Sequence, residues 1–514
     1  MAELDRPFPP GDYPLVVVGS GPGGIQLSYC LSRVGVEHAV LSADAGPGGM
    51  FRRWPFFQRL LSWTKPFAAA ERRSRAYERY DWNSLLADEP EHRSIMPDLM
   101  DGTNEFPSRP EMEQNLAAFA ERTGVRVRYS TRWTGTREEP GEGEDGVHFV
   151  LETTDGEYRA PVVVFAVGVA EPLTPPGTGL ELGDHYATVR DAASYAGRRV
   201  FIAGKRNSGF ELASGLLPWA RQIVLASPSP AKLSVNTRSL VGVRARYVQP
   251  LEDHILGGGV FVLDAAIERV SRTADGTFRV ALRRTDGSGD LTLEADEVIA
   301  ATGFRTPVGD LPALGVATVG SAEIPAQTPW WESATRPGIY FAGTISQGAA
   351  GLRKHGQPAN SGAVHGARYN ARVLARHLAA SRFGVDLSAP PIAPNGLVDR
   401  LLEEVSTSAD LWHQKGYLAW VASAAPDGGY RDEGVQPLAH ALDGGGADAI
   451  ILTIEAGPEG EIYPVAYLRT AHGAEEVVLE PNAFLDFTTP GHRRAFEDAV
   501  ARLDGRPGRP AGTG

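Results

Sequence analysis

The spacing of apolar residues near the N-terminus predicts a strand, a helix and a second strand in close succession. Leu15–Val18 is an unbroken apolar run, mostly β-branched, which is typical of a strand buried on both faces. Apolar residues recur at helical spacing through residues 26–34, and a second short apolar run follows at residues 38–41. This order of elements indicates a βαβ unit with parallel strands.

The turn between the first strand and the helix reads GSGPGG. In a βαβ unit the first glycine allows a tight turn, the next lets a pyrophosphate approach the backbone, and the last lets the helix pack closely on the strand. The N–H groups at the start of the helix then bind the phosphates. The turn therefore predicts a dinucleotide site, to which we assign Gly19, Gly21, Gly23 and Gly24.

An acidic residue usually follows the second strand of such a unit and binds the ribose. This chain has Ser42 there instead, with Asp44 two residues later. Either side chain could reach a 2′-hydroxyl, and the sequence leaves the choice between them open.

The same order of elements occurs again in the middle of the chain. Residues 198–203 are predicted as a strand, residues 210–220 have helical spacing and residues 222–226 are predicted as the next strand. The turn between the first two reads GKRNSG. We assign to a second nucleotide site Gly204, Lys205, Arg206, Asn207 and Ser208.

Two cations distinguish the second turn from the first. Arg206 replaces the middle glycine, and Lys205 precedes it. Adjacent cations beside a phosphate site favour a ligand with an additional phosphate, which indicates NADPH rather than NADH. The alternative is a pair of solvated charges on a turn. Two nucleotide units in one chain are explained if one holds a flavin nucleotide and the other brings a nicotinamide to it.

The pattern changes beyond about residue 388. Residues 388–396, SAPPIAPNG, are typical of a linker. Helical spacing at residues 397–405 and 493–503, with three strand-like segments between them, predicts an α+β appendage. This region has no nucleotide fingerprint. Dimerisation, a lid over the active site and recognition of a carrier protein are all compatible with it, and we expect any homodimer to form through it.

Composition narrows the partners and the compartment. The net charge of −13 argues against nucleic acid or an anionic membrane as the main partner, because both require a basic face. Cys30 is the only cysteine, which excludes an intramolecular disulfide, a CxxC pair and a thiolate metal site. No histidine cluster has metal-ligand spacing, and no apolar run approaches about 18 residues. We therefore expect a cytoplasmic protein without a metal, acting on a small molecule.

A series of motifs resembles the flavin-containing and N-hydroxylating (class B) monooxygenases, which are flavoproteins with two dinucleotide-binding domains. The resemblance covers roughly residues 13–380. Besides the two glycine turns, it rests on GGMFRRW (48–54), SWTKP (62–66), FPSRPEME (106–113), VVVFAVG (162–168), VIAATGF (298–304), TPWWES (328–333) and PGIYFAGT (337–344).

The resemblance implies an α/β fold with two Rossmann-like domains, the second inserted into the first. The AVG and ATG segments resemble the hinge strands that leave the FAD domain and return to it. The implied organisation is FAD-binding domain 1–175 and 295–387, NADPH-binding domain 176–294, and C-terminal α+β domain 388–514.

The resemblance also implies roles for individual residues. Ser62, in place of an asparagine, and Lys65 would lie beside the flavin ring. Implied contacts of FAD are Gly49, Arg52, Arg109, the backbone of Val127 at adenine, Thr302 and Gly303 at the returning hinge, and Gly343 and Thr344 at the ribityl chain. The loop after Thr344 would follow the flavin's edge, placing Arg353, Lys354 or His355 near the ring carbonyls or the substrate, where a cation stabilises reduced flavin. Solvated loop charges are the alternative.

The implied activity is NADPH-dependent reduction of FAD, followed by reaction with O₂ to give a flavin C4a-(hydro)peroxide that oxygenates a small molecule. The Baeyer–Villiger fingerprint appears only in shortened form, as Leu182-Gly183-Asp184-His185, which favours amine N-oxygenation. The alternatives are an NAD(P)H-dependent flavin reductase or oxidase without oxygen insertion, and a flavin-bound redox sensor.

Part of the chain, GDHYATVRDAASYAGRRVFIAGKRNS, is also similar to bacillithiol-disulfide-reductase-like flavoproteins. Those enzymes act through a cysteine in the first glycine loop, and the corresponding position here is Gly23. Cys30 lies about two helical turns later, where a buried structural role is expected.

Overall fold

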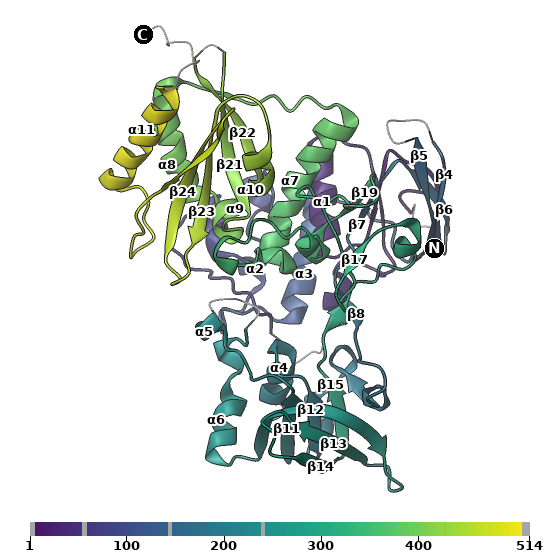
Figure 1. Cartoon of the computed structure of the whole chain (residues 1–514). Helices are drawn as coiled ribbons and strands as arrows, with labels where there is room; N and C mark the ends of the chain where they lie inside the picture. Colours follow the sequence, from purple (N-terminus) through teal and green to yellow (C-terminus); the bar gives the residue numbers. More distant parts are fainter. Residues whose placement is uncertain (1–5, 54–58, 142–145, 238–241, 427, 506–514) are drawn as a thin grey trace.

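The computed structural model describes residues 6–53, 59–141, 146–237, 242–426 and 428–505, and three packed units make up this part of the chain (Figure 1). Trp54 of the GGMFRRW motif and residues 506–514 lie outside the described residues. No helix within the described ranges has the length and apolar character needed to cross a membrane.

The first unit is built on a parallel four-stranded sheet in the order β19-β7-β2-β3. Its strands are β2 (Leu15–Val18), β3 (Ala39–Leu41), β7 (Val162–Phe165) and β19 (Ile339–Phe341). Helices α1 (Pro22–Arg33), α3 (Arg109–Thr123) and α7 (Val364–Phe383) cover one face, and β4 (Trp133–Pro140), β5 (Val147–Thr153) and β6 (Gly156–Ala160) cover the other.

Side-chain alternation along β2 explains these layers. Leu15 and Val17 pack with the helices, whereas Val16 and Val18 pack with β4–β6, because successive strand side chains point to opposite faces. A strand buried on both faces must be apolar throughout, which is why the sequence signal was a continuous run. Helices α1 and α7 lie side by side on this sheet.

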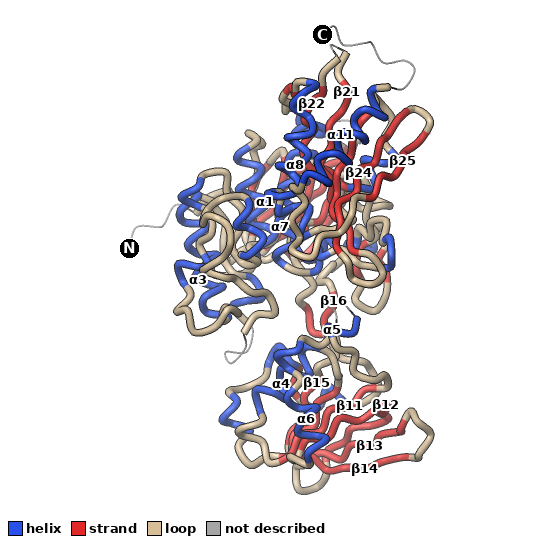
Figure 2. Tube along the Cα trace, turned by 90° about the vertical axis from the view of Figure 1, so that its left-hand side faces the viewer, coloured by secondary structure: helices blue, strands red, loops and turns tan. Residues whose placement is uncertain are grey.

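The second unit is a seven-stranded sheet in the order β14-β13-β12-β11-β10-β15-β9. Its strands are β9 (Asp184–His185), β10 (Arg199–Ala203), β11 (Gln222–Ser227), β12 (Val260–Arg272), β13 (Phe278–Arg284), β14 (Asp290–Ala295) and β15 (Glu297–Ala300). Helices α4 (Asn207–Leu216) and α6 (Gln249–Leu256) lie with it (Figure 2). Strands β9, β15, β10, β11 and β12 pair in parallel, whereas β12, β13 and β14 pair antiparallel.

The third unit is a six-stranded sheet in the order β20-β22-β21-β23-β24-β25, antiparallel throughout. Its strands are β20 (Pro391–Ile392), β21 (Leu418–Ala424), β22 (Tyr430–Pro437), β23 (Ala449–Ala456), β24 (Ile462–Thr470) and β25 (Gly473–Val478). Helices α8 (Leu397–Thr407) and α11 (Pro490–Asp504) cover one face, and α10 (Leu438–Asp443) covers the other. Short α9 (Ala409–His413) precedes β21.

The fold class predicted from the sequence is confirmed: two Rossmann-like sheets are joined to a C-terminal α+β unit. The C-terminal unit lies against the first unit rather than apart from it (Figure 1). Arg372 on α7 donates to buried Asp410 at 2.7 Å, and Asn360 donates through its side chain to the His413 carbonyl at 2.6 Å.

Candidate functional site

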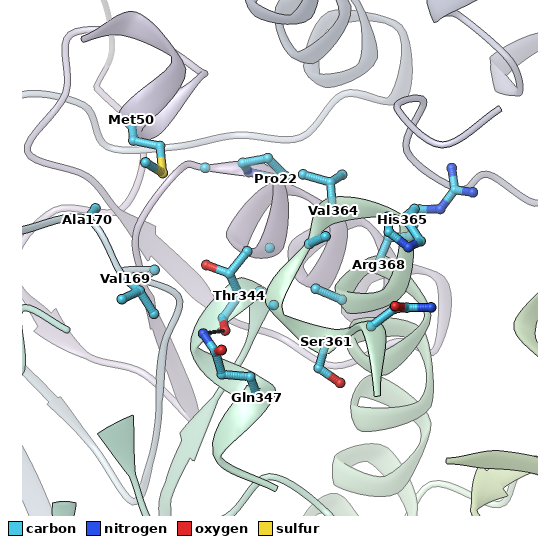
Figure 3. Close-up of a pocket in the computed structure, with 18 of the residues that line it drawn as sticks. Pro22, Met50, Val169, Ala170, Thr344, Gln347, Ser361, Val364, His365 and Arg368 are labelled. Atoms are coloured by element: carbon cyan, nitrogen blue, oxygen red, sulfur yellow. Dashed lines mark hydrogen bonds between the residues drawn. The ribbon is translucent and has the colours of Figure 1, made fainter. Parts of the chain in front are cut away.

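All three units line one cavity of about 1440 Å³. Pockets for single drug-sized ligands usually measure about 300–1,000 Å³, so this cavity has room for more than one ligand. It extends from the first glycine turn past Met50 and Thr344 toward Asn207 in the second unit and Trp412 in the third. Figure 3 shows the part near Thr344 and the start of α7.

Three glycines of the first turn are required by packing within the protein. A Cβ atom on Gly19, which has φ of +119°, would lie 2.5 Å from the Ala166 carbonyl oxygen. A Cβ on Gly23 would lie 2.3 Å from the Cα of Gly343, and one on Gly24 would lie 1.9 Å from the Gly19 oxygen. These glycines therefore let the strands and α1 approach closely.

Gly21 is different, because the protein leaves space for a side chain there. The only atom within 4 Å of a Cβ at this position is the Cα of Gly49, at 4.0 Å, and both residues line the cavity. The missing side chain thus keeps open a cradle at the N-terminus of α1. Such a cradle fits a dinucleotide pyrophosphate, which must approach the backbone closely.

Two long helices begin at the cavity wall. Helix α1 starts at Pro22 and α7 starts at Val364, and Figure 3 shows the two residues next to each other. The N-terminal end of a helix carries a partial positive charge and free N–H groups, which favour an anion. This part of the cavity therefore suits the pyrophosphate and the negative charge of a reduced flavin.

Both candidate ribose residues line the cavity. The hydroxyl of Ser42 lies 2.7 Å from that of Ser20, and the carboxylate of Asp44 accepts from Arg53 at 2.6 Å. The structure thus leaves both side chains at the wall.

The Ser62 segment contains a fixed polar network. Ser62 donates its hydroxyl to the Asn83 side-chain oxygen, and the Asn83 amide donates to the Thr64 hydroxyl at 3.0 Å. Thr64 in turn donates to buried Asp81 at 2.9 Å. Position 62 carries a serine in place of the asparagine of the monooxygenases, but Asn83, from a different segment, lies beside it. Ser62 and Asn83 both line the cavity.

Two arginines expected at FAD are held elsewhere. Arg52 and Arg109 each form an ion pair with Glu113 of α3, at 3.2 and 3.1 Å, and neither lines the cavity. Arg53 lines it instead. Because Glu113 binds both guanidinium groups, the structure does not bring Arg52 or Arg109 to the wall. Contact of Arg52 and Arg109 with FAD therefore stays a prediction.

In the second glycine turn, Gly209 packs α4 on the sheet and the two cations have different surroundings. A Cβ on Gly209 would lie 2.1 Å from the Gly204 oxygen, so this glycine packs α4 on β10. Lys205 is buried and its ammonium binds Asp264 of β12, whereas exposed Arg206 caps the start of α4. Of the two cations expected at a phosphate, Lys205 is therefore neutralised by a carboxylate, which leaves Arg206.

The loop between β19 and α7 faces the C-terminal unit. Lys354 forms an ion pair with Glu455 at 2.8 Å and another with Glu476, and His355 lies 3.2 Å from the Tyr463 hydroxyl. Both residues line the cavity, but their polar groups are used between the units. Two carboxylates neutralise Lys354 in this structure, and its place near the flavin ring or the substrate stays a prediction.

Aromatic rings pack at the junction of the first and third units. Trp82 stacks on His365 with ring centroids 4.2 Å apart, and His413 lies edge-on to Trp82 at 5.6 Å. His365 is only 1% exposed, and neither of its ring nitrogens has a hydrogen-bond partner among the described residues. Burial, reinforced by nearby Arg368, Lys415 and Arg244, lowers the pKa of His365 well below its ordinary value, so the ring is neutral.

Three cations, Lys415, Arg79 and Arg244, lie at the same end of the cavity. Lys415 donates to the Trp412 carbonyl at 2.6 Å and forms no ion pair with a described residue. Burial, followed by the charge of Arg79, lowers the pKa of Lys415 to about 8, so it remains mostly protonated at neutral pH. Arg79 lies 3.5 Å over the Trp412 ring, and Arg244 lies 5.8 Å over that of Trp63.

The cavity separates the sequence-predicted residues into two sets. Those on its wall are Gly19, Gly21, Gly23, Ser42, Asp44, Gly49, Ser62, Asn207, Ser208, Gly343, Thr344, Lys354 and His355. Those away from it are Gly24, Arg52, Lys65, Arg109, Val127, Gly204, Lys205, Arg206, Thr302 and Gly303.

Several wall residues were missed by sequence reasoning. Asn83, Arg244 and Lys415 belong to no motif, so no local signal identifies them. His365 and His413 also line the cavity, and neither belongs to a motif that marks it as a site residue.

The chain belongs to the pyridine nucleotide-disulphide oxidoreductase family, whose model matches residues 16–343. It is similar to the mouse (Mus musculus) FAD-dependent oxidoreductase domain-containing protein 2, with 27% identity over 433 residues, which are 78% of this chain and 63% of that protein. The chain thus spans less than two thirds of the length of that relative.

Two solved structures share the fold. A flavin-containing monooxygenase from Stenotrophomonas maltophilia matches with a TM-score of 0.53 and 22% identity, over 72% of this chain and 98% of that one. An ornithine N-hydroxylase from Kutzneria sp. 744 matches with a TM-score of 0.54 and 18% identity, over 72% and 100%.

These matches confirm the resemblance to flavoproteins with two dinucleotide-binding domains. The chain thus belongs to a family of pyridine nucleotide oxidoreductases. Unlike a disulfide reductase, it has no cysteine at the cavity: Cys30, the single cysteine of the sequence, is buried in α1. Burial raises the pKa of the Cys30 thiol to about 12, so it provides no thiolate at neutral pH.

Proposed function

We propose that the protein is an NADPH-dependent flavin monooxygenase that oxygenates a small molecule, with an amine nitrogen as the preferred acceptor. The observation that carries this proposal is the shared cavity: both nucleotide turns open into it, no thiol lines it, and the C-terminal unit closes one side. An enclosed site beside the flavin can hold an organic substrate and exclude water.

The overall reaction balances as substrate, O₂, NADPH and a proton giving oxygenated substrate, NADP⁺ and water. FAD would lie at the Gly19–Gly24 turn, and it would supply the two-electron chemistry that links NADPH to O₂. The chain's own residues would bind the pyrophosphate at α1, position the ring beside Ser62 and Asn83, and keep bulk water out with the C-terminal wall.

The amine preference is supported by the shortened Leu182–His185 motif and by the name of the Kutzneria relative, an ornithine N-hydroxylase. In the structure, the ring of His185 bonds the Gly303 carbonyl at 3.0 Å, at the junction of the first two units. The role of that histidine is therefore structural. We also propose the domain limits given above for the FAD, NADPH and C-terminal regions.

The main alternative is a reductase or oxidase that passes electrons from NADPH to O₂ as hydrogen peroxide. We expect the NADPH-reduced protein to react with O₂ in two resolved phases in stopped-flow absorbance, with NADP⁺ slowing the second phase. Hydrogen peroxide should account for well under one equivalent of the NADPH oxidised when substrate is present. A single phase with one peroxide per NADPH would contradict monooxygenation and identify the oxidase.

Coenzyme choice provides a separate prediction at the second turn. Arg206→Gln should raise the KM for NADPH by at least about tenfold, because a charge-assisted hydrogen bond contributes about 1.5–3 kcal/mol. The KM for NADH should change little, since NADH lacks the 2′-phosphate. Steady-state kinetics with both coenzymes measure this.

Lys205→Met is the matched comparison, because Asp264 already neutralises Lys205. It should leave the ratio of the two KM values near that of the wild type. Equal weakening of both coenzymes in Arg206→Gln would show that this cation binds the shared pyrophosphate, and the preference for NADPH would then be wrong.

A further inference from the structure

The junction of the first and third units contains a group of polar atoms that the flavin and nicotinamide turns do not use. His365 lies in the first turn of α7, and Figure 3 shows this turn beside the cavity. Lys415 precedes β21 of the C-terminal unit. Both side chains line the cavity, although the two residues come from different units.

His365 is a buried polar side chain without a hydrogen-bond partner among the described residues. It is 1% exposed, its ring is fixed against Trp82, and both nitrogens lack partners among the described residues. Buried polar groups in folded proteins are nearly always hydrogen-bonded. A bound ligand that accepts a hydrogen bond from the neutral ring would remove this cost.

Lys415 adds a positive charge that the described part of the protein does not neutralise with a carboxylate. Within the described part of the chain, its ammonium donates one hydrogen bond, to the Trp412 carbonyl, and so retains further donors. Glu455, which lies beside Gly416, is already bound by Lys354 and by the Tyr467 hydroxyl at 2.6 Å. The other nearby charges, on Arg79 and Arg244, are also positive.

Arg368 lies at the same wall and makes several hydrogen bonds inside the protein. This guanidinium donates to the carbonyls of Ser84 and Asp81 and to the Tyr369 hydroxyl at 3.2 Å, whereas its buried Nε has no partner among the described residues. Donors for a ligand at this end of the cavity are those of Lys415 and His365, with the Nε of Arg368 beside them.

We infer that Lys415 and His365 together form a subsite for the carboxylate of the substrate, so that the oxygenated molecule is an organic acid. The inference rests on the proposed function, because it identifies the substrate class of the same site. A carboxylate accepts one charge-assisted bond from the Lys415 ammonium and one bond from the imidazole N–H. An amine acceptor would then be one that carries its own acid group, since the positive surroundings disfavour a ligand with net positive charge.

Binding of matched acids and amides to the FAD-loaded protein tests the subsite without turnover. The probes are 3-phenylpropanoate and 4-phenylbutanoate, each compared with its carboxamide by isothermal titration calorimetry at pH 7 in the presence of NADP⁺. We expect at least one acid to bind about tenfold or more tightly than its amide, because only the acid forms the charge-assisted bond. Equal affinities, or no binding by either acid up to millimolar concentration, would overturn the inference.

Variants assign the effect to the two residues. Lys415→Met should bring the acid-to-amide ratio close to one, whereas Lys232→Met, at an exposed lysine of the second unit, should leave it unchanged. His365→Phe keeps a ring against Trp82 but removes both nitrogens, and should lower the ratio about threefold or more; it decides the question if Lys415→Met does not fold. An unchanged ratio in both variants would overturn the subsite.

The outcome is separable from the proposed function. The acid-to-amide ratio is an equilibrium measurement that does not require O₂, whereas the monooxygenase proposal depends on peroxide stoichiometry during turnover. If Lys415→Met shifts the flavin reduction potential and leaves the ratio intact, the cation serves the flavin and the inference is wrong.

Discussion

Gly21→Val should yield a folded protein that has lost FAD. A Cβ at this position meets no protein atom closer than the Gly49 Cα, at 4.0 Å, so the protein itself leaves space for a side chain to begin there. The methyl groups of a valine would, however, fill the cradle at the start of α1. Losing two charge-assisted bonds from backbone N–H groups to the pyrophosphate, at about 1.5–3 kcal/mol each, weakens binding by at least about 100-fold.

The flavin-to-protein absorbance ratio after gel filtration measures this effect, and circular dichroism confirms folding. Gly445→Val is the control, because a Cβ there also meets nothing within 4 Å but lies in the C-terminal unit away from the cavity wall. Full flavin content in Gly21→Val would contradict the assignment of the first turn to FAD. By contrast, Gly24→Val should disrupt folding itself, since its Cβ would collide with the Gly19 oxygen.

The sequence predicts the parallel sheets well because their signals are local. An apolar run, a glycine turn and a helical period together determine a βαβ unit, and the strands at Leu15–Val18 and Gln222–Ser227 are observed within a residue of the predicted ends. The helix starts were placed too late, at residues 26 and 210 rather than Pro22 and Asn207. Each helix begins with three residues that show no apolar period, Pro-Gly-Gly in α1 and Asn-Ser-Gly in α4.

The composition of the cavity wall could not be predicted in the same way, because it depends on contacts distant in sequence. Arg52 forms an ion pair with Glu113, Lys205 with Asp264, and Lys354 with Glu455. A cation in a motif can be assigned to a ligand from sequence, but a carboxylate elsewhere in the chain decides whether its charge remains available. Lys415 shows the converse, since it belongs to no motif and yet lines the cavity.

Asp410→Asn should release the C-terminal unit from the first unit. The Asp410 carboxylate is 1% exposed and binds Arg372 at 2.7 Å and Arg75 at 3.3 Å. Burial by itself would raise its pKa, but Arg372 and Arg75 outweigh it and lower the pKa to about 2. Removing one partner of a buried ion pair costs about 3–5 kcal/mol, because the remaining charges stay buried without compensation.

Urea titration and the rate of proteolysis at the 388–396 linker measure this loss, with exposed Asp443→Asn as the matched control. The same contact predicts an acid dependence in the wild type. A depressed carboxyl pKa stabilises the folded state above the unfolded value of about 4 and loses that contribution as pH falls toward 2. The proteolysis rate of the wild type should therefore rise across that window, while that of Asp410→Asn, already high at neutral pH, should change much less. Equal neutral-pH rates for Asp410→Asn and Asp443→Asn would show that this ion pair does not hold the C-terminal wall of the cavity in place.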